Sequence, residues 1–235
     1  MKKFKLTSEF IVDISGVKLF RIKALIEFGN VKAGDLGGYI EKEKNLSHMG
    51  NAWVSGNAQV FGNARVSGDA QVFGDAQVFG NARVFGNAWV SGDAQVFGNA
   101  WVSGNAQVSG NAWVFGDAQV FGNAQVFGNA RVFGNARVSG NARVSGDAQV
   151  FDNAQVFGDA RVSGDKDYAY AHGFGSCNRT TTFFRLKDGD VGVRCGCFYG
   201  TLAQFRDNVC ETHGETKKAQ EYLMLADLMD FRFKN

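Results

Sequence analysis

Small and aliphatic residues alternate with polar ones along most of the chain, and the alternation is broken at a fixed interval. From residue 50 to 164, six residues repeat as Gly, Asn or Asp, Ala, a variable residue, Val, and Phe or Ser, with Val at every sixth position from Val54 to Val162. A period of six fits neither a straight helix nor a coiled coil. It fits a short strand followed by a corner, because Gly and Asn accept left-handed backbone conformations at low cost. The pattern therefore predicts a coil with Ala and Val filling its axis.

The order aliphatic, any, Gly, Asn or Asp, small, any resembles the hexapeptide repeat of left-handed parallel β-helices, in which three hexapeptides form one triangular coil. The resemblance covers residues 50–164 of the chain. It implies a mainly β protein with a solenoid of about six coils. A wider, right-handed helix of the bactofilin type, which is also rich in short repeats, is the alternative.

Arranging the repeats on a period of eighteen places unequal side chains on the three outer faces. One face receives a Phe in every coil, whereas the other two mix Phe with Ser. Because Ala and Val point inward, the residue after Val points outward. We therefore expect an exposed apolar ladder, a kind of surface that usually contacts another molecule; the alternative is a corner row covered by its own stacked neighbours. The residues of this Phe ladder are Phe61, Phe79, Phe97, Phe115, Phe133 and Phe151.

Residues 1–49 are expected to form strands and a capping coil. The apolar segments 10–14 and 17–22, on either side of Ser15-Gly16, predict a hairpin. Extending the hexapeptide register backwards places Leu46 in the Ala position and His48 in the Val position of a degenerate first coil. Large residues there suit an end cap, which a solenoid needs because its terminal coil exposes the core.

The segment 33–41, Ala-Gly-Asp-Leu-Gly-Gly-Tyr-Ile-Glu, belongs to the same expected coil. With the later Asn-Leu-Ser, it resembles a set of bacterial and phage-encoded hexapeptide-repeat proteins. The resemblance implies a microbial, prophage-type origin and no particular reaction.

The period ends after residue 164, and residues 165–235 are expected to form a small α+β domain. Strands are predicted at 180–186 and 191–198. Two helices should follow, with Thr201 and Thr216 as their N-caps. This ββαα unit should pack on the end of the solenoid or along the Phe ladder.

Residues 172–180 contain glycines, a hydroxyl and an Arg, which together could bind a phosphate or carboxylate. No helix follows directly, so the loop is not a P-loop. The alternative is an ordinary Gly-rich connection with a surface Arg. The ligand-binding candidates are His172, Gly175, Ser176 and Arg179.

A second set of residues has the side chains of a zinc site but not its usual spacing. Cys195 and Cys197 would share one face of a strand, and His213 lies near Cys210 in the sequence, with Cys177 upstream. Zinc sites favour two to four residues between paired ligands, and free Cys is commonly buried in protein cores. We therefore expect no metal and no cofactor.

Composition narrows the possible functions. The repeats carry six Arg and seven Asp, so they lack the basic stripe typical of nucleic-acid binding. The sequence contains no run of about eighteen apolar residues, so it predicts no membrane-spanning helix. The four Cys do not form a disulfide framework, and a reducing cytoplasm is expected. Left-handed β-helix acyltransferases generally use a His and a projecting loop, whereas the repeats here contain neither.

The sequence therefore favours a non-enzymatic interaction or scaffold protein. Its solenoid face and C-terminal domain would bind either a second copy of the chain, giving a dimer or trimer, or a different protein. A phage-encoded inhibitor of a host factor is one example of an interaction protein of the second kind. Binding or turnover of a small, nucleotide-like anion by the C-terminal domain is the alternative. Hexapeptide acyl transfer is a third reading with less support.

Overall fold

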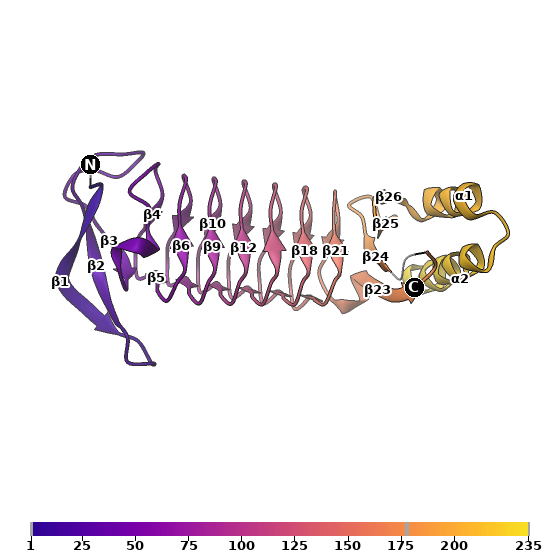
Figure 1. Ribbon diagram of the computed structural model, residues 1–235, viewed down its shortest axis with the longest axis horizontal. Coiled ribbons are helices and arrows are strands. Elements are labelled where there is room, and N and C mark those ends of the chain that lie inside the picture. Colours follow the sequence, from indigo (N-terminus) through magenta and orange to yellow (C-terminus); the bar gives the residue numbers. More distant parts are fainter. Residues whose placement is uncertain (1, 177–178, 235) are drawn as a thin grey trace.

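Every repeat contributes one two-residue strand, formed by the variable residue and the Val that follows it. The computed structural model describes residues 2–176 and 179–234. In it, the repeats form a long parallel β-solenoid with a hairpin at one end and an α+β layer at the other (Figure 1). The repeat strands are β4 (Trp53–Val54), β5 (Gln59–Val60), β6 (Arg65–Val66), β7 (Gln71–Val72), β8 (Gln77–Val78), β9 (Arg83–Val84), β10 (Trp89–Val90), β11 (Gln95–Val96), β12 (Trp101–Val102), β13 (Gln107–Val108), β14 (Trp113–Val114), β15 (Gln119–Val120), β16 (Gln125–Val126), β17 (Arg131–Val132), β18 (Arg137–Val138), β19 (Arg143–Val144), β20 (Gln149–Val150), β21 (Gln155–Val156) and β22 (Arg161–Val162).

The solenoid has three sides because strands eighteen residues apart lie next to each other, as Gln59 lies opposite Gln77. One sheet runs through β3 (Leu36–Ile40), β5, β8, β11, β14, β17 and β20, the second from β4 to β22 and the third from β6 to β21. The parallel β-solenoid expected from the hexapeptide pattern is confirmed. It has about seven turns instead of six, because residues before the repeats supply part of a first coil.

The Ala and Val side chains of the repeats fill the axis, and none of them is more than 1% exposed. Backbone N–H groups of one coil donate to carbonyls of the next, as from Gln59 to Ala76 at 2.9 Å. At the corners, Gly62 has a φ of 66°, and a Cβ there would lie 3.1 Å from the carbonyl oxygen of Gly80. Glycine is required for both reasons, the backbone conformation and the close approach of neighbouring coils.

The N-terminal end begins with the expected hairpin of β1 (Phe4–Val12) and β2 (Lys18–Ala24). The hairpin projects sideways from the solenoid (Figure 1). The carboxylate of Asp13 closes its turn by accepting the N–H groups of Ser15 and Val17. β2 pairs with β3, which joins the first sheet beside β5.

The expected register of the first coil is wrong by two residues. Leu46 forms a parallel bridge with Val66 and so takes the Val position, not the Ala position. His48 lies outside the axis, where its ring stacks on Phe4 with centroids 4.3 Å apart. Partners in this coil are twenty residues apart, because two extra residues precede the regular repeats.

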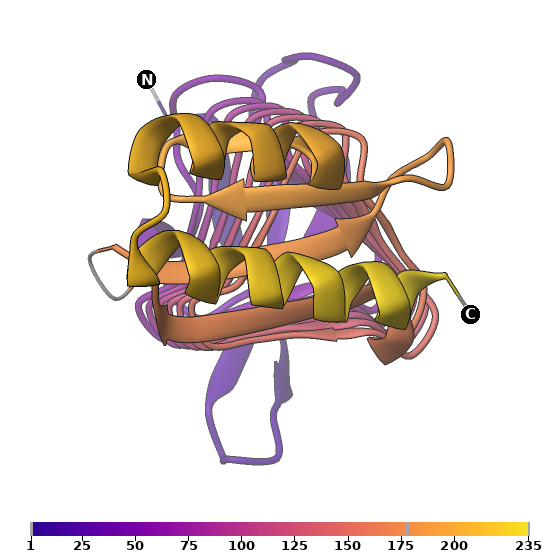
Figure 2. The ribbon, with the colours of Figure 1, turned by 90° about the vertical axis from the view of Figure 1, so that its right-hand side faces the viewer.

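Beyond the solenoid lie η2 (Asp165–Asp167) and a four-stranded antiparallel sheet in the order β23 (Tyr168–Phe174), β24 (Arg179–Arg185), β25 (Val191–Cys195) and β26 (Phe198–Thr201). The helices α1 (Leu202–His213) and α2 (Lys217–Phe233) cover its outer face (Figure 2). Thr201 and Thr216 cap the two helices as expected. The sequence reading missed β23 and the turn at Gly196 that divides the last strand in two.

Strand β24 joins the two parts of the molecule through adjacent residues. Phe184 is fully buried in the core of the solenoid, and Phe183 is fully buried in a second core beneath α1 and α2. The C-terminal domain therefore closes the end of the solenoid and does not lie along the Phe ladder.

Candidate functional site

The Phe ladder is a continuous stack of parallel rings. Centroids of successive rings lie 4.9 to 5.2 Å apart, and the first five rings are tilted by no more than 4° from their neighbours. All six side chains are half-buried. Trp113 packs edge-on against Phe97 and Phe115. The stack therefore covers its ring faces with its own neighbours and presents mainly ring edges, the second of the two geometries considered from the sequence.

The most exposed apolar side chains lie at the two ends of the molecule. On α2, Met224, Leu228 and Phe231 are 71%, 55% and 71% exposed. Their spacing of four and three residues places them on one helix face, opposite the buried residues Ala226 and Met229. The sequence reading missed this row, although its i, i+4, i+7 spacing signals it. At the other end, the hairpin exposes Phe10, Val12 and Ile14.

The Gly-rich loop brings the predicted anion-binding residues to one end of the β23–β24 hairpin, but its backbone donors are already used. The N–H of Gly175 donates to the carboxylate of Glu221 at 2.8 Å, and the N–H of Ser176 donates to the Tyr222 hydroxyl at 3.0 Å. Both partners come from α2. A bound anion would have to displace a carboxylate, so the loop is tied to the helix layer in this structure.

The remaining two candidates of that loop are exposed. The ring Nδ1 of His172 lies 3.1 Å from the hydroxyl of Thr180 across the hairpin. The guanidinium of Arg179 lies against Gly196, where a Cβ would collide with it. Ligand binding by this loop stays a prediction.

The three cysteines that the structure describes are free thiols: Cys195 lies on β25, Cys197 in the turn after it, and Cys210 on α1. Cys195 accepts a hydrogen bond from Thr181 at 3.2 Å and approaches the Tyr222 hydroxyl at 3.8 Å. The ring of His213 stacks against Tyr222, while Cys197 and Cys210 are exposed. Burial raises the pKa of Tyr222. Within residues 2–176 and 179–234, no three His, Cys, Asp or Glu side chains are placed to hold a metal; Cys177 lies outside these residues.

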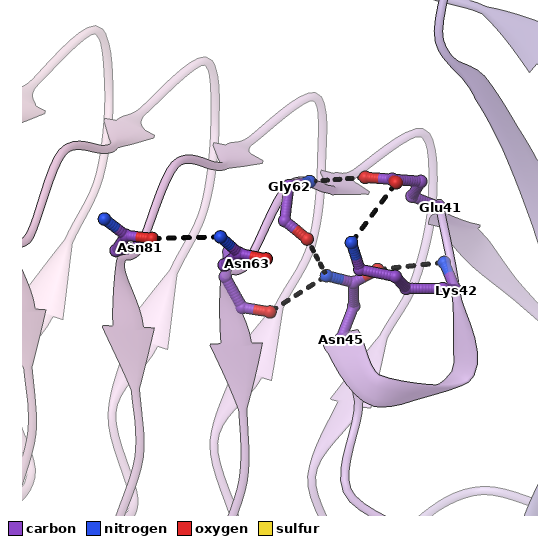
Figure 3. A network of polar contacts seen from close by, with 7 residues as sticks. Glu41, Lys42, Asn45, Gly62, Asn63 and Asn81 are labelled. Atoms are coloured by element: carbon purple, nitrogen blue, oxygen red, sulfur yellow. Dashed lines mark hydrogen bonds and ion pairs between the residues drawn. The ribbon is translucent and has the colours of Figure 1, made fainter.

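Three side chains that the sequence reading overlooked complete the first coil. Asn45, in the short helix η1 (Glu43–Asn45), donates its amide to the carbonyl oxygens of Gly62 and Ala64 at 3.2 and 2.9 Å (Figure 3). Glu41 accepts the N–H of Gly62 at 2.6 Å in the same network. The carbonyls of Gly62 and Ala64 face the start of the solenoid, where no earlier coil supplies a backbone N–H to them.

The third side chain is Lys3, whose ammonium donates to the carbonyl oxygens of Gly50 and Ala52 at 3.2 and 2.7 Å. Lys3 is only 1% exposed. Burial lowers its pKa to about 8, and the charge of Asp69 opposes part of this change.

At the opposite end, the last coil has backbone N–H groups without a following coil to accept them. There the capping side chains are acceptors instead of donors. Gln155 N–H donates to the Thr182 hydroxyl at 2.9 Å, and Gln149 N–H donates to Asp165 at 3.1 Å. Each end of the solenoid therefore has caps of the polarity that its backbone requires.

Comparison with known proteins agrees with this repeat architecture. The chain is similar to the YdcK β-solenoid repeat in six successive matches, at residues 58–74, 76–92, 94–108, 106–122, 124–138 and 136–152. No curated protein shows significant similarity to it. Among the described residues, no helix is long and apolar enough to cross a membrane.

Proposed function

We propose that the protein is a non-enzymatic interaction protein in which the solenoid is a rigid spacer and the outer face of α2 binds a second copy of the chain. The observation that carries the proposal is the row of Met224, Leu228 and Phe231, each more than half exposed. Contiguous exposed apolar side chains of this kind usually mark a contact surface. The helix is held in place by a buried face and by the bond from Gly175 to Glu221, so this row is presented rigidly.

The charges along α2 favour an antiparallel second copy as the occupant. Lys217 and Lys218 lie in the first turn, where the helix dipole disfavours cations, and that turn contains no acidic residue. In an antiparallel pair centred on Leu228, these lysines would lie just beyond the last turn of the partner helix, on the side of its C-terminal carbonyls. A twofold axis would make this contact at both ends of the pair at once.

Catalysis is less well supported than interaction. The loop that resembled an anion-binding site is occupied by Glu221 and Tyr222. The repeats contain no His and no inserted loop of the acyltransferase kind. We place the dimer in the cytoplasm of a bacterial host, consistent with three free thiols. The phage origin rests on the resemblance of segment 33–41 and the Asn-Leu-Ser that follows it. If the protein is phage-encoded, the same α2 face would bind a host protein in place of the second copy.

The molar mass of the protein in solution tests the proposal. We expect a dimer by light scattering after gel filtration, and a monomer for the double variant Leu228→Glu, Phe231→Glu. Two controls should remain dimeric. The first is Ile14→Glu, on an even more exposed apolar site at the far end, and the second is Phe115→Ser, which tests the Phe ladder with a residue that the repeat itself uses at this position. A monomeric wild type, or dissociation by Phe115→Ser alone, would overturn the assignment to α2.

A further inference from the structure

A groove lies in front of the first coil, on the side where the third sheet begins. That sheet starts at β6, because below it the chain forms η1 and the single bridge of Leu46 to Val66 instead of a strand. The hollow left by this change has a volume of about 560 Å³. Its lining residues are Glu43, Lys44, Leu46, Ser47, His48, Arg65, Val66 and Ser67.

The groove has an excess of positive charge. In the part of the chain that the structure describes, neither Lys44 nor Arg65 forms an ion pair. The only lining carboxylate, Glu43, is bound by the ammonium of Lys2 at 2.7 Å, and this contact lowers the pKa of Glu43. Arg83 lies directly opposite Arg65 in the next coil. Like charges directly opposite each other in a sheet are destabilising, so this pair does not serve the stability of the fold.

Hydroxyl and aromatic groups complete the surface. Ser47 accepts the N–H of Met49 at 3.0 Å, which leaves its own hydroxyl proton free to donate. Ser67 lies on the β6 side of the groove. In the same column, one coil beyond Arg83, Trp101 is 41% exposed, and Arg83 lies 5.3 Å from its ring centroid. Two strand spacings, or about 10 Å, thus separate Arg65 from Trp101.

We propose that this groove and the adjoining column bind a nucleoside phosphate. Lys44 and Arg65 would hold the phosphate, because guanidinium and ammonium groups form charge-assisted hydrogen bonds to phosphate oxygens. Arg83 and Trp101 would receive the planar base by stacking. The site is separate from the Gly-rich loop and from the α2 face, and the proposal does not depend on dimer formation.

Calorimetric titration of the full chain with ADP, pyrophosphate and adenosine tests this site. We expect ADP to bind more tightly than pyrophosphate, and adenosine to bind weakly. Arg65→Ala and Lys44→Ala should each weaken ADP binding about tenfold or more. Trp101→Ala should weaken binding of ADP and leave that of pyrophosphate unchanged.

The control is Arg137→Ala, which removes an exposed Arg from the same sheet and repeat position, away from the groove. Its affinity for ADP should equal that of the wild type. Absence of ADP binding, an equal loss in Arg137→Ala and Arg65→Ala, or equal affinity for ADP and pyrophosphate would overturn the proposal. The variants that test dimer formation lie on α2, and the variants that test ADP binding lie at the first coils. The two proposals can therefore fail separately.

Discussion

The side-chain amide of Asn45 donates to the backbone carbonyl of Ala64 over 2.9 Å, in the place where a backbone N–H serves in the following coils. Its other proton bonds the carbonyl of Gly62, and its oxygen accepts the N–H of Lys42. The amide is thus fully used. An exposed strand edge is a template for pairing with another chain, so this residue both closes the first coil and ends the solenoid.

Replacement of Asn45 by Ala should leave two carbonyls without donors, that of Ala64 buried and that of Gly62 partly buried. We expect a loss of about 2 kcal/mol in the free energy of unfolding, since each unsatisfied buried group costs about 1 kcal/mol or more. Hydrogen exchange should show the loss in β5 and β6 first. The control is Asn135→Ala at an exposed corner, where unfolding should change little. Equal effects of the two substitutions would contradict the capping role.

The buried Lys3 predicts that the N-terminal end becomes more stable above pH 8. Its pKa is about 8 in the folded protein and 10.5 ordinarily, so between these values the unfolded chain binds a proton that the folded chain does not. The free energy of unfolding therefore rises with pH in this window. We expect a gain of about 2 kcal/mol from pH 8 to 9.5. Urea unfolding, followed through the buried Trp53, measures it.

Two tyrosines oppose this rise in the free energy of unfolding at higher pH. A hydrogen bond to Asp152 raises the pKa of Tyr170 to about 12, and burial raises the pKa of Tyr168 above its ordinary value of 10. The folded state keeps these protons when the unfolded state loses them, so stability falls above pH 10. In Lys3→Met the rise between pH 8 and 9.5 should disappear while the later fall remains. A rise that persists in Lys3→Met would refute the assignment.

The exact period of the repeats made the middle of the fold predictable, whereas its ends depend on contacts between distant residues. A Val at every sixth position determines the three sheets and all inward side chains. Nothing local marks Lys3 or Asn45 as caps, because their partners lie 49 and 19 residues away. Similarly, the two-residue shift that places Leu46 in the Val position is visible only when Val66 is its neighbour.

Asparagine ladders run along the corners and end at aspartates. Asn57 donates its amide to Asp75 at 3.0 Å, but Asp75 cannot donate to Asp93, the next residue in the column. Asp75→Asn should extend the ladder and remove a like-charge pair, raising the melting temperature by about 2 °C. The reverse change, Asn105→Asp, keeps the bond from Asn87 and loses the one to Asn123, so it should lower the melting temperature by a similar amount. A lower melting temperature for Asp75→Asn would contradict the ladder argument.

The Phe ladder should stabilise the solenoid through its stacking. Phe97 has a Phe on each side and Trp113 at its edge. We expect Phe97→Ala to lower the free energy of unfolding by about 2 kcal/mol. Phe121 has the same repeat position but lies between Ser103 and Ser139 in its column and is 37% exposed, so Phe121→Ala should cost less than about 1 kcal/mol. Equal losses in chemical denaturation would exclude stacking as the cause.

The candidate site was less predictable than the fold, for a physical reason. The Gly-rich loop had the composition of an anion site, but the carboxylate of Glu221, 46 residues away, takes the Gly175 N–H. The outer row of α2 could have been read from its spacing. Whether such a row faces a core or water depends on which side of the helix meets the sheet, and that is set by Phe183 and its neighbours.

Adjacent residues of β24 should control separate parts of the molecule. Phe184 packs into the end of the solenoid and Phe183 under α1 and α2, because successive side chains of a strand point to opposite faces. Phe184→Ala should speed hydrogen exchange in β20 to β22 and weaken docking of the C-terminal domain, at a cost of about 3 kcal/mol. Phe183→Ala should speed exchange in α1 and α2 and leave the last coil protected. If the two variants gave the same exchange pattern, β24 would belong to one cooperative unit, and the division of the core would be wrong.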